Sequence, residues 1–385
     1  MKYRFLKQYF FILLWFSTLS HVMAQEVSIG LRPDWATDFA AEEYHFDQQK
    51  VIGSHQFNWL DANQFHAGRK ECVYDKMIGY YRYPSLSEYF EIHLDGSFQQ
   101  IILHDFRIYR DGNWLDLTKD LQYEMKRFTS IFRGVEIAHY DILRLNLSAL
   151  RVGDVLHVSY TEKGVQADLK GYTNLKSVVD ESSKERYYLR LSYPTDATMQ
   201  YFLSDADLPP PVKEAQGPDS VWLWDIRQVN NYNQAYAFKG LHESSIPSWY
   251  QLVKSITVSD LVEPSVLYEL SRQNYQLDRL PSTQVIRFTE ELLNGLSTKE
   301  EKVQQIFSFL QEDIYYLTNR YITPFQPEEV LDTRMGDCKA KSLLGVKMLA
   351  SIGINAWRSS GFQFGDVSKL RQLQESPCYM AYSDV

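Results

Sequence analysis

The chain has 385 residues, of which 44% are hydrophobic, 15% aromatic and 23% charged. This composition excludes a wholly disordered protein, and the length is typical of two domains. Lys and Arg number 40 against 49 Asp and Glu, giving a formal net charge of -9. Broad nucleic-acid binding requires a basic excess and is therefore excluded. Three cysteines are too few for a disulfide scaffold.

Residues 1–24 predict a signal peptide. Basic residues at Lys2, Arg4 and Lys7 precede an almost wholly apolar run over 9–16, and Ala24 ends a segment suited to signal peptidase. A membrane anchor is the alternative, but the apolar run is too short to span a bilayer comfortably. We expect an exported protein, periplasmic or secreted, with no transmembrane segment after cleavage.

Residues 25–255 predict a β-rich domain. Apolar and polar residues alternate along short segments such as 143–147 and 187–193, which is typical of strands with one buried face. Asp95-Gly96 and Asp111-Gly112 indicate hairpins, because glycine accepts a positive φ without steric cost. Many strands joined by short turns favour an antiparallel β-sandwich.

The pattern changes to a helical period at about residue 260, so residues 256–280 are interpreted as a linker with a helix. Within residues 281–385, Ser297 and Glu300 resemble a capping box at a helix start. A shorter helix is expected before it. The apolar face predicted for the capped helix consists of Val303, Ile306, Phe307, Leu310 and Ile314.

Cys338 is the candidate nucleophile. Asp337 is suited to capping a helix that continues to about Ile352, so Cys338 lies in its first turn. Helix-start N–H groups stabilise a thiolate or an oxyanion, and we expect Lys339 and Lys341 to add positive charge. The alternative is a buried structural cysteine, which is the commoner role for a single Cys.

The predicted helix also has an apolar face and a C-terminal cap that can be identified from the sequence. Its apolar face is expected to be Ala340, Leu343, Leu344, Met348 and Ile352, and Gly353 is suited to ending it. Residues 354–362 then predict a strand.

The run from Thr323 to Ser360 resembles the core of the transglutaminase-like superfamily, a papain-like group with a Cys-His-Asp triad. The matching positions are 327–331, Arg334, 336–339, Leu343, Leu344 and 353–356, whereas the family usually has an acid where Ala340 stands. The resemblance implies a papain-like α+β fold and acyl transfer at amide bonds by Cys338. It also implies a protein or peptide substrate, and no metal or other cofactor is expected.

The β-rich part has a resemblance of its own. Residues 153–160, 246–250 and the segment Ser255 to Ser259 are similar to a β-rich domain of unknown function that precedes transglutaminase-like domains in bacterial envelope proteins. The order of the two domains matches that arrangement.

The triad cannot be completed from this sequence. None of the nine histidines follows Cys338, and the nearest before it is His242. One interpretation is that residues 281–385 are the N-terminal part of a longer transglutaminase-like domain, and we expect this. The alternative is a non-catalytic binding or assembly module of the envelope with a degenerate domain.

Overall fold

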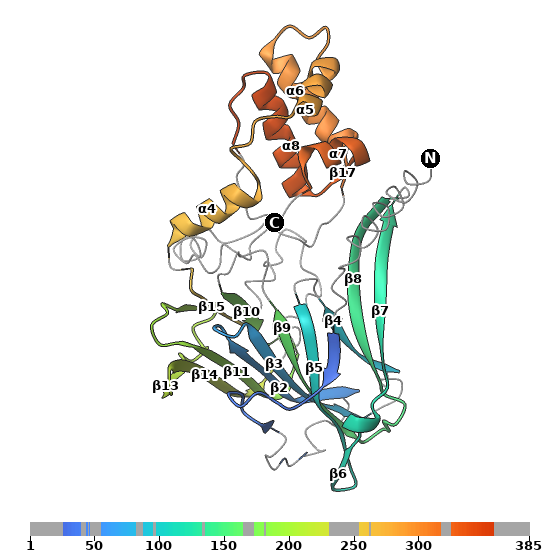
Figure 1. The fold of residues 1–385 in the computed structure, drawn as a ribbon, viewed down its shortest axis with the longest axis vertical. Coiled ribbons are helices and arrows are strands. Elements are labelled where there is room, and N and C mark those ends of the chain that lie inside the picture. The colour runs from blue at the N-terminus through green and yellow to red at the C-terminus, as the bar shows by residue number, and fades with distance from the viewer. Residues whose placement is uncertain are drawn as a thin grey trace, which may run out of the picture.

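A computed structural model describes residues 26–39, 44, 46, 55–81, 88–94, 98–132, 135–164, 173–180, 182–230, 254–261, 263–316 and 325–357 (Figure 1). The predicted signal peptide lies outside these ranges. Within them, no helix has the length and apolar character needed to cross a membrane.

A nine-stranded sheet forms the centre of the β-rich part. Its strands β1-β5-β9-β3-β2-β11-β14-β13 are hydrogen-bonded in that order, and β6 pairs with β5. The β1–β5 and β2–β11 pairs are parallel, and the other pairs are antiparallel. The bounds are β1 Glu26–Ile29, β2 Gln56–His66, β3 Glu71–Tyr80, β5 Phe98–Arg110, β6 Asn113–Asp116, β9 Val155–Gly164, β11 Lys184–Pro194, β13 Val212–Gln216 and β14 Asp219–Val229.

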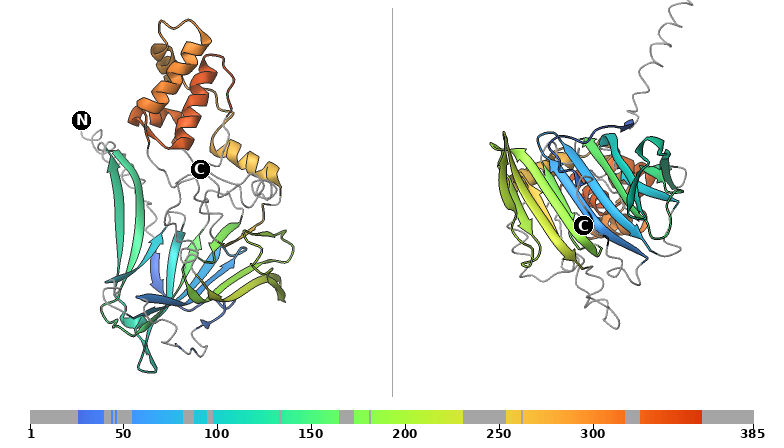
Figure 2. Two further views of the ribbon diagram at one scale, coloured as in Figure 1. Left: turned by 180° about the vertical axis from the view of Figure 1, so that it is seen from behind. Right: turned by 90° about the horizontal axis from the view of Figure 1, so that it is seen from below.

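Two three-stranded sheets accompany the large one. One is β4-β8-β7 and the other is β10-β15-β12. From below, the teal strands β7 and β8 and the yellow strand β15 lie on opposite sides of the central blue strands (Figure 2). The bounds are β4 Tyr89–Leu94, β7 Tyr123–Phe132, β8 Val135–Asn146, β10 Asn174–Val178, β12 Gln200–Leu203 and β15 Ser255–Ser259, with a 3₁₀ turn over Thr118–Asp120.

Both small sheets pack on the same face of the large sheet. Asn63 is the register partner of Tyr74 and of Leu189, so all three side chains point to one face. Tyr74 contacts the core shared with Leu143 and Leu145 of β8, and Leu189 belongs to the core shared with β15. This layered and mainly antiparallel arrangement confirms the predicted fold class. The two parallel pairs were not predicted.

The two predicted hairpin turns have different outcomes. Asp111 and Gly112 have φ of 50° and 83° and join β5 to β6, as predicted. Asp95-Gly96 lies outside the described residues. Its flanking strands are not hairpin partners, because β4 pairs with β8 and β5 pairs with β9.

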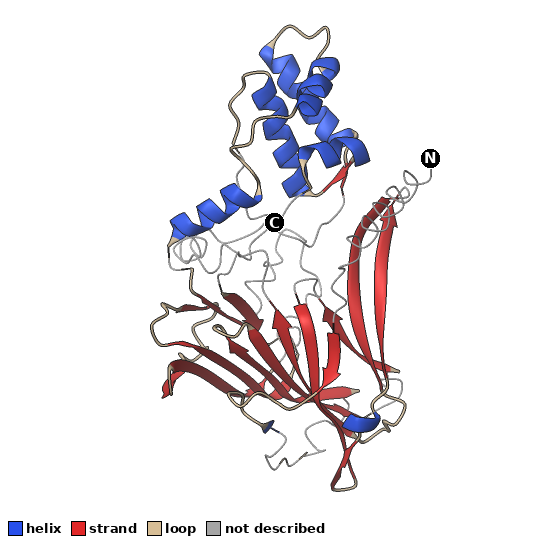
Figure 3. Cartoon of the chain, in the orientation of Figure 1, coloured by secondary structure: helices blue, strands red, loops and turns tan. Residues whose placement is uncertain are grey.

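Four helices form a separate cluster within the described residues, which Figure 3 shows gathered at one end of the molecule. Their core includes Val285, Ile306, Phe309, Leu344 and Met348. A further helix, α4, precedes them, and β15 extends to Ser259, within the range predicted as linker. The bounds are α4 Pro264–Asn274, α5 Thr283–Leu292, α6 Lys299–Glu312, α7 Pro327–Thr333 and α8 Cys338–Ser351, with short strands β16 Tyr315–Tyr316 and β17 Met335–Gly336.

The start and face of α6 differ by one or two positions from the prediction. Thr298 and Glu301 form the capping box, rather than Ser297 and Glu300. Phe309 is buried, whereas Phe307 is 54% exposed. The apolar stripe is therefore rotated towards α5, where Phe309 packs on Phe288 with 4.9 Å between ring centroids.

Candidate functional site

Cys338 is the first residue of α8, as predicted. Asp337 caps the helix: its Oδ1 accepts a hydrogen bond from the Ala340 N–H at 2.9 Å, and the residue is 1% exposed. Cys338 is half-buried. A capped helix start with a partly accessible thiol is a geometry in which cysteine can act as a nucleophile.

The rest of α8 is held by close packing in the helical core. Leu343, Leu344 and Met348 are buried, and a Cβ on Gly345 would lie 2.8 Å from Leu310 Cδ1. Gly345 therefore allows α8 to approach α6 closely. This packing confirms the predicted apolar face. It also sets the orientation of α8 and therefore the position of Cys338 at its start.

The C-terminal end of α8 and the segment that follows it are only partly as predicted. Gly353 has φ of 74° and follows the helix end, as expected for a left-handed cap. Ile354 N–H donates to the Leu349 carbonyl at 2.9 Å, which closes the last turn. The described residues 354–357 are not in a strand, and the remainder of the predicted strand 354–362 lies outside the described residues.

Tyr316 is a neighbour of Cys338 that the sequence analysis missed. The parallel β16–β17 pair places Tyr316 opposite Gly336, two residues before Cys338. Burial raises the pKa of the Tyr316 phenol, and the Cys338 thiol adds to this rise through its charge and a side-chain hydrogen bond. Tyr316 is 54% exposed, so it lies at the surface beside the thiol. The sequence signal was weak, since a two-residue strand shows no periodicity.

The two nearby lysines are engaged by other groups. Lys339 Nζ lies 2.7 Å from Asp337 Oδ2, and both side chains are buried. Lys341 Nζ donates to the Ile314 carbonyl at 3.0 Å, and burial lowers the pKa of this amine. Both lysines lie near Cys338, and the charge of Lys339 is partly offset by Asp337, which the sequence did not indicate.

Arg334 supports the turn that leads to Cys338. It adopts φ of 57° after α7, and its N–H donates to the Val330 carbonyl at 2.9 Å. Its guanidinium carbon lies 4.7 Å from the ring centroid of Phe288 and 5.0 Å from that of Phe309. These cation–π contacts join α5, α6 and the segment before Cys338.

Native alkylation should separate the two described cysteines. Burial raises the pKa of the Cys72 thiol to about 12, and this side chain is 6% exposed. The reactive species is the thiolate, so iodoacetamide should modify Cys338 and leave Cys72 intact at neutral pH. Peptide mapping of a Cys378→Ser variant, with and without urea, measures this. Equal labelling of Cys72 in native protein would contradict the burial argument.

No histidine whose side chain is described completes a triad with Cys338. His55 is exposed, and the other described histidines with assigned contacts bind residues of the β-rich part; His242 lies outside the described residues. The assigned pairs are His66–Asp219 at 3.3 Å, His93–Glu91 at 3.8 Å, His104–Thr161 at 2.6 Å and His157–Asp75 at 3.2 Å. The described residues also contain no cluster of three or more His, Cys, Asp or Glu suited to a metal ion.

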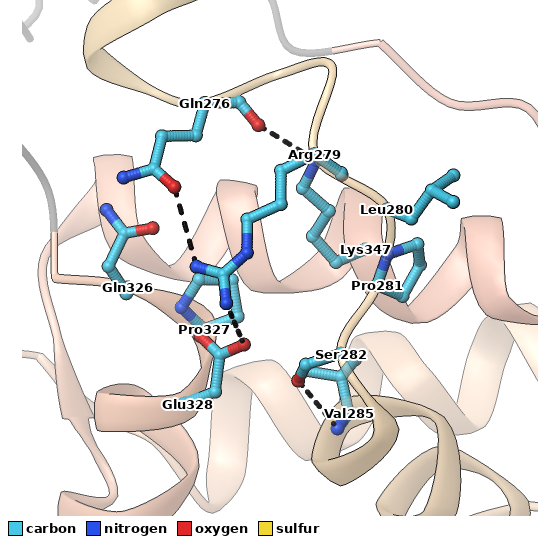
Figure 4. A pocket seen from close by; sticks show the side chains of 10 residues that line it. All are labelled: Gln276, Arg279, Leu280, Pro281, Ser282, Val285, Gln326, Pro327, Glu328 and Lys347. Atoms are coloured by element: carbon cyan, nitrogen blue, oxygen red, sulfur yellow. Dashed lines mark hydrogen bonds and ion pairs between the residues drawn. The ribbon is translucent and has the colours of Figure 1, made fainter.

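A small hollow among the described residues beside α8 does not include Cys338. It is lined by Gln276, Arg279, Ser282, Glu328 and Lys347, among others (Figure 4). Lys347 Nζ donates to three main-chain carbonyls, those of residues 276, 277 and 279, at 3.2, 2.9 and 2.5 Å. This end of α8 is the one opposite to Cys338, so the hollow is a packing feature of the α4–α5 connection.

Two parts of the chain match models of known families. Residues 286–374 match the model of the transglutaminase-like superfamily, and residues 86–232 match a domain of unknown function with solved structure, DUF3857. Both resemblances inferred from the sequence are confirmed. The search of curated proteins found no significant match.

Two solved structures are similar to parts of the chain. A crystal structure from Parabacteroides distasonis ATCC 8503, described as a "putative protease", has a TM-score of 0.61 at 13% identity and covers 78% of this chain. The match covers 59% of that protein, so this chain spans about three fifths of its length. A native yeast LTA4 hydrolase matches with a TM-score of 0.26 at 8% identity, covering 62% of this chain and 35% of that one, which is too low to support an argument.

Proposed function

We propose that Cys338 is the nucleophile of an acyl-transfer reaction at amide bonds of a protein or peptide. The observation that carries this proposal is the half-buried thiol at the capped start of α8, inside the region that matches the transglutaminase-like superfamily. The similar protease supports a peptide substrate, but only by likeness of fold.

The proposed reaction uses the Cys338 thiol and the main-chain groups at the start of α8. Cys338 Sγ attacks the carbonyl carbon, the carbon–nitrogen bond breaks, and the amine leaves with a proton, which gives a thioester. Main-chain N–H groups at the start of α8 are suited to stabilising the oxyanion. Water then releases an acid, whereas a second amine forms a new amide. Hydrolysis and cross-linking are both compatible with these residues.

Acylation by an activated ester tests the nucleophile directly. A p-nitrophenyl ester has a leaving group that needs no protonation, so a reactive thiol forms the thioester without an acid–base partner. Intact mass spectrometry should show one acyl group per chain, mapped to Cys338 and absent from Cys338→Ser. Cys72→Ser is the matched control and should be acylated like wild type. A chain that is folded but not acylated at Cys338 would overturn the proposal.

Export is part of the proposed function. The basic and apolar pattern of residues 1–24 favours action in the periplasm or outside the cell. N-terminal sequencing of the protein from an envelope fraction should begin at Gln25. A mature protein that retains residues 1–24 would contradict export by signal cleavage.

A non-catalytic envelope module is the second candidate function. It is favoured by the described histidines with assigned contacts, all of which are engaged within the β-rich part. In this case Cys338 would be acylated no faster than the cysteine of an unstructured peptide, so the rate of acylation in the same experiment separates the two candidates.

A further inference from the structure

Residues 30–39, here called the strap, cross the face of the nine-stranded sheet that the small sheets leave open. Asp75, Ala62 and Tyr188 are register partners on this face, opposite to that of Tyr74 and Leu189. The strap meets successive strands in the order β5, β9, β3, β2 and β11. Its contacts, in chain order, are Gly30 with His104, Arg32 with Ser159 and Asp75, Trp35 with Glu71, Thr37 with Gln64 and Tyr188, and Phe39 with Tyr188.

Arg32 makes the central contact. Its two terminal nitrogens bind both carboxylate oxygens of Asp75 at 2.8 and 2.5 Å, and one of them also donates to Ser159 Oγ at 2.8 Å. The Arg32 side chain is 11% exposed and that of Asp75 is fully buried. A bidentate arginine–carboxylate pair is strong and geometrically specific.

The floor under the strap is unusually polar for the middle of a sheet. Asp75, Gln64, Ser159 and Thr161 are 0% exposed, and His157 is 1% exposed. Buried polar groups require partners, and the strap supplies several of them. Gln64, for example, accepts from the Thr37 N–H at 2.7 Å and donates to the Thr37 carbonyl at 2.9 Å.

The strap itself is bound as peptide ligands are bound. Trp35 and Phe39 are 7% and 0% exposed, whereas Leu31 is 95% exposed. Side chains that point inwards occupy the sheet face, and main-chain groups of Gly30, Trp35 and Thr37 are hydrogen-bonded by side chains of the floor. Main-chain hydrogen bonds give affinity for an extended segment, and buried side-chain anchors give specificity for its sequence.

We propose that this face of the nine-stranded sheet is a peptide-recognition groove, occupied in cis by the strap. Its ligand is an extended segment with an arginine that binds Asp75 and aromatic anchors placed as Trp35 and Phe39 are. The resident strap blocks the groove, and a weakened strap opens it to the same segment supplied by another molecule. This groove is independent of Cys338.

The experiment uses the full chain, its Arg32→Ala variant and a fluorescent peptide with the sequence of residues 28–40. Fluorescence anisotropy should show at least about 10-fold tighter peptide binding by Arg32→Ala than by wild type, because the variant strap lacks the bidentate anchor. A peptide in which its own arginine is replaced by alanine should lose at least about 10-fold in affinity for the variant. Equal binding of both peptides, or no binding by a folded Arg32→Ala chain, would overturn the proposal.

Thermal stability gives a second readout. The peptide should raise the melting temperature of Arg32→Ala more than that of wild type, since the variant strap lacks the Arg32 anchor and is displaced more readily in the native state. If Arg32→Ala does not fold, Arg32→Lys is used in its place, because lysine keeps the positive charge but cannot form the bidentate hydrogen bonds of the guanidinium. An unchanged melting temperature of the folded variant at saturating peptide would count against the groove.

Discussion

Peptide amides should remain intact in the presence of the 385-residue chain, although its Cys338 accepts an acyl group from an activated ester. Amide cleavage needs a proton for the leaving amine, and general acid–base catalysis contributes about 10²- to 10⁴-fold. Histidine suits this task because its pKa lies near neutrality. No histidine follows Cys338, and those described elsewhere with assigned contacts bind residues of the β-rich part.

The measurement is turnover on a peptide panel, with a fluorescent amine as the alternative acceptor. Neither hydrolysis nor amine incorporation should exceed the background given by Cys338→Ala. Turnover that disappears in Cys338→Ala would show that an acid–base partner is present. His242→Ala would then be the next variant, since His242 is the histidine nearest to Cys338 in the sequence.

The start of α8 could be predicted from sequence because its determinants are local. Asp337 caps the helix through a hydrogen bond to the residue three positions later, and Gly353 follows its end. Tyr316 could not be predicted, because it reaches Cys338 through a two-residue parallel pairing with β17. Contacts of this kind depend on how separate elements pair, which periodicity does not encode.

In the β-rich part, too, the sequence predicted strands but not which strands pair. Alternation of apolar and polar residues identified strands such as β9 and β11, but both faces of each strand are buried, rather than the one face that was expected. It did not identify partners: β2 pairs in parallel with β11, far along the chain, and β4 pairs with β8 rather than β5. The strap was missed as well. The apolar residues in 30–39 show neither a helical nor a strand periodicity, and the segment is held in place by side chains of five strands.

Buried charges between distant strands are the least predictable feature, and Asp61 is the clearest case. Asp61 Oδ2 lies 2.5 Å from Lys184 Nζ, and Asp61 also pairs with Lys76. The Lys184 side chain is 1% exposed. Burial by itself would raise the pKa of Asp61, but the charges of Lys76 and Lys184 outweigh it and lower this pKa well below its usual range.

Replacing Asp61 by alanine should therefore lower the free energy of unfolding by about 3–5 kcal/mol at pH 7, since it leaves the ammonium of Lys184 buried without its carboxylate. Urea unfolding followed by tryptophan fluorescence measures this. Asp207→Ala, which breaks the exposed pair with Lys254, is the matched control and should cost about 0–1 kcal/mol. An additional Lys184→Met change should recover much of the loss, because it removes the unpaired charge.

The effect should depend on pH with a definite sign. The folded-state pKa of Asp61 is lowered, so its contribution is fully present above the unfolded-state pKa of about 3.9 and is lost as the pH falls towards the folded value. The difference between wild type and Asp61→Ala should be constant from pH 7 to about 5 and should shrink below about pH 4. A difference that grows on acidification would mean that the two lysines do not stabilise the Asp61 carboxylate in the folded protein.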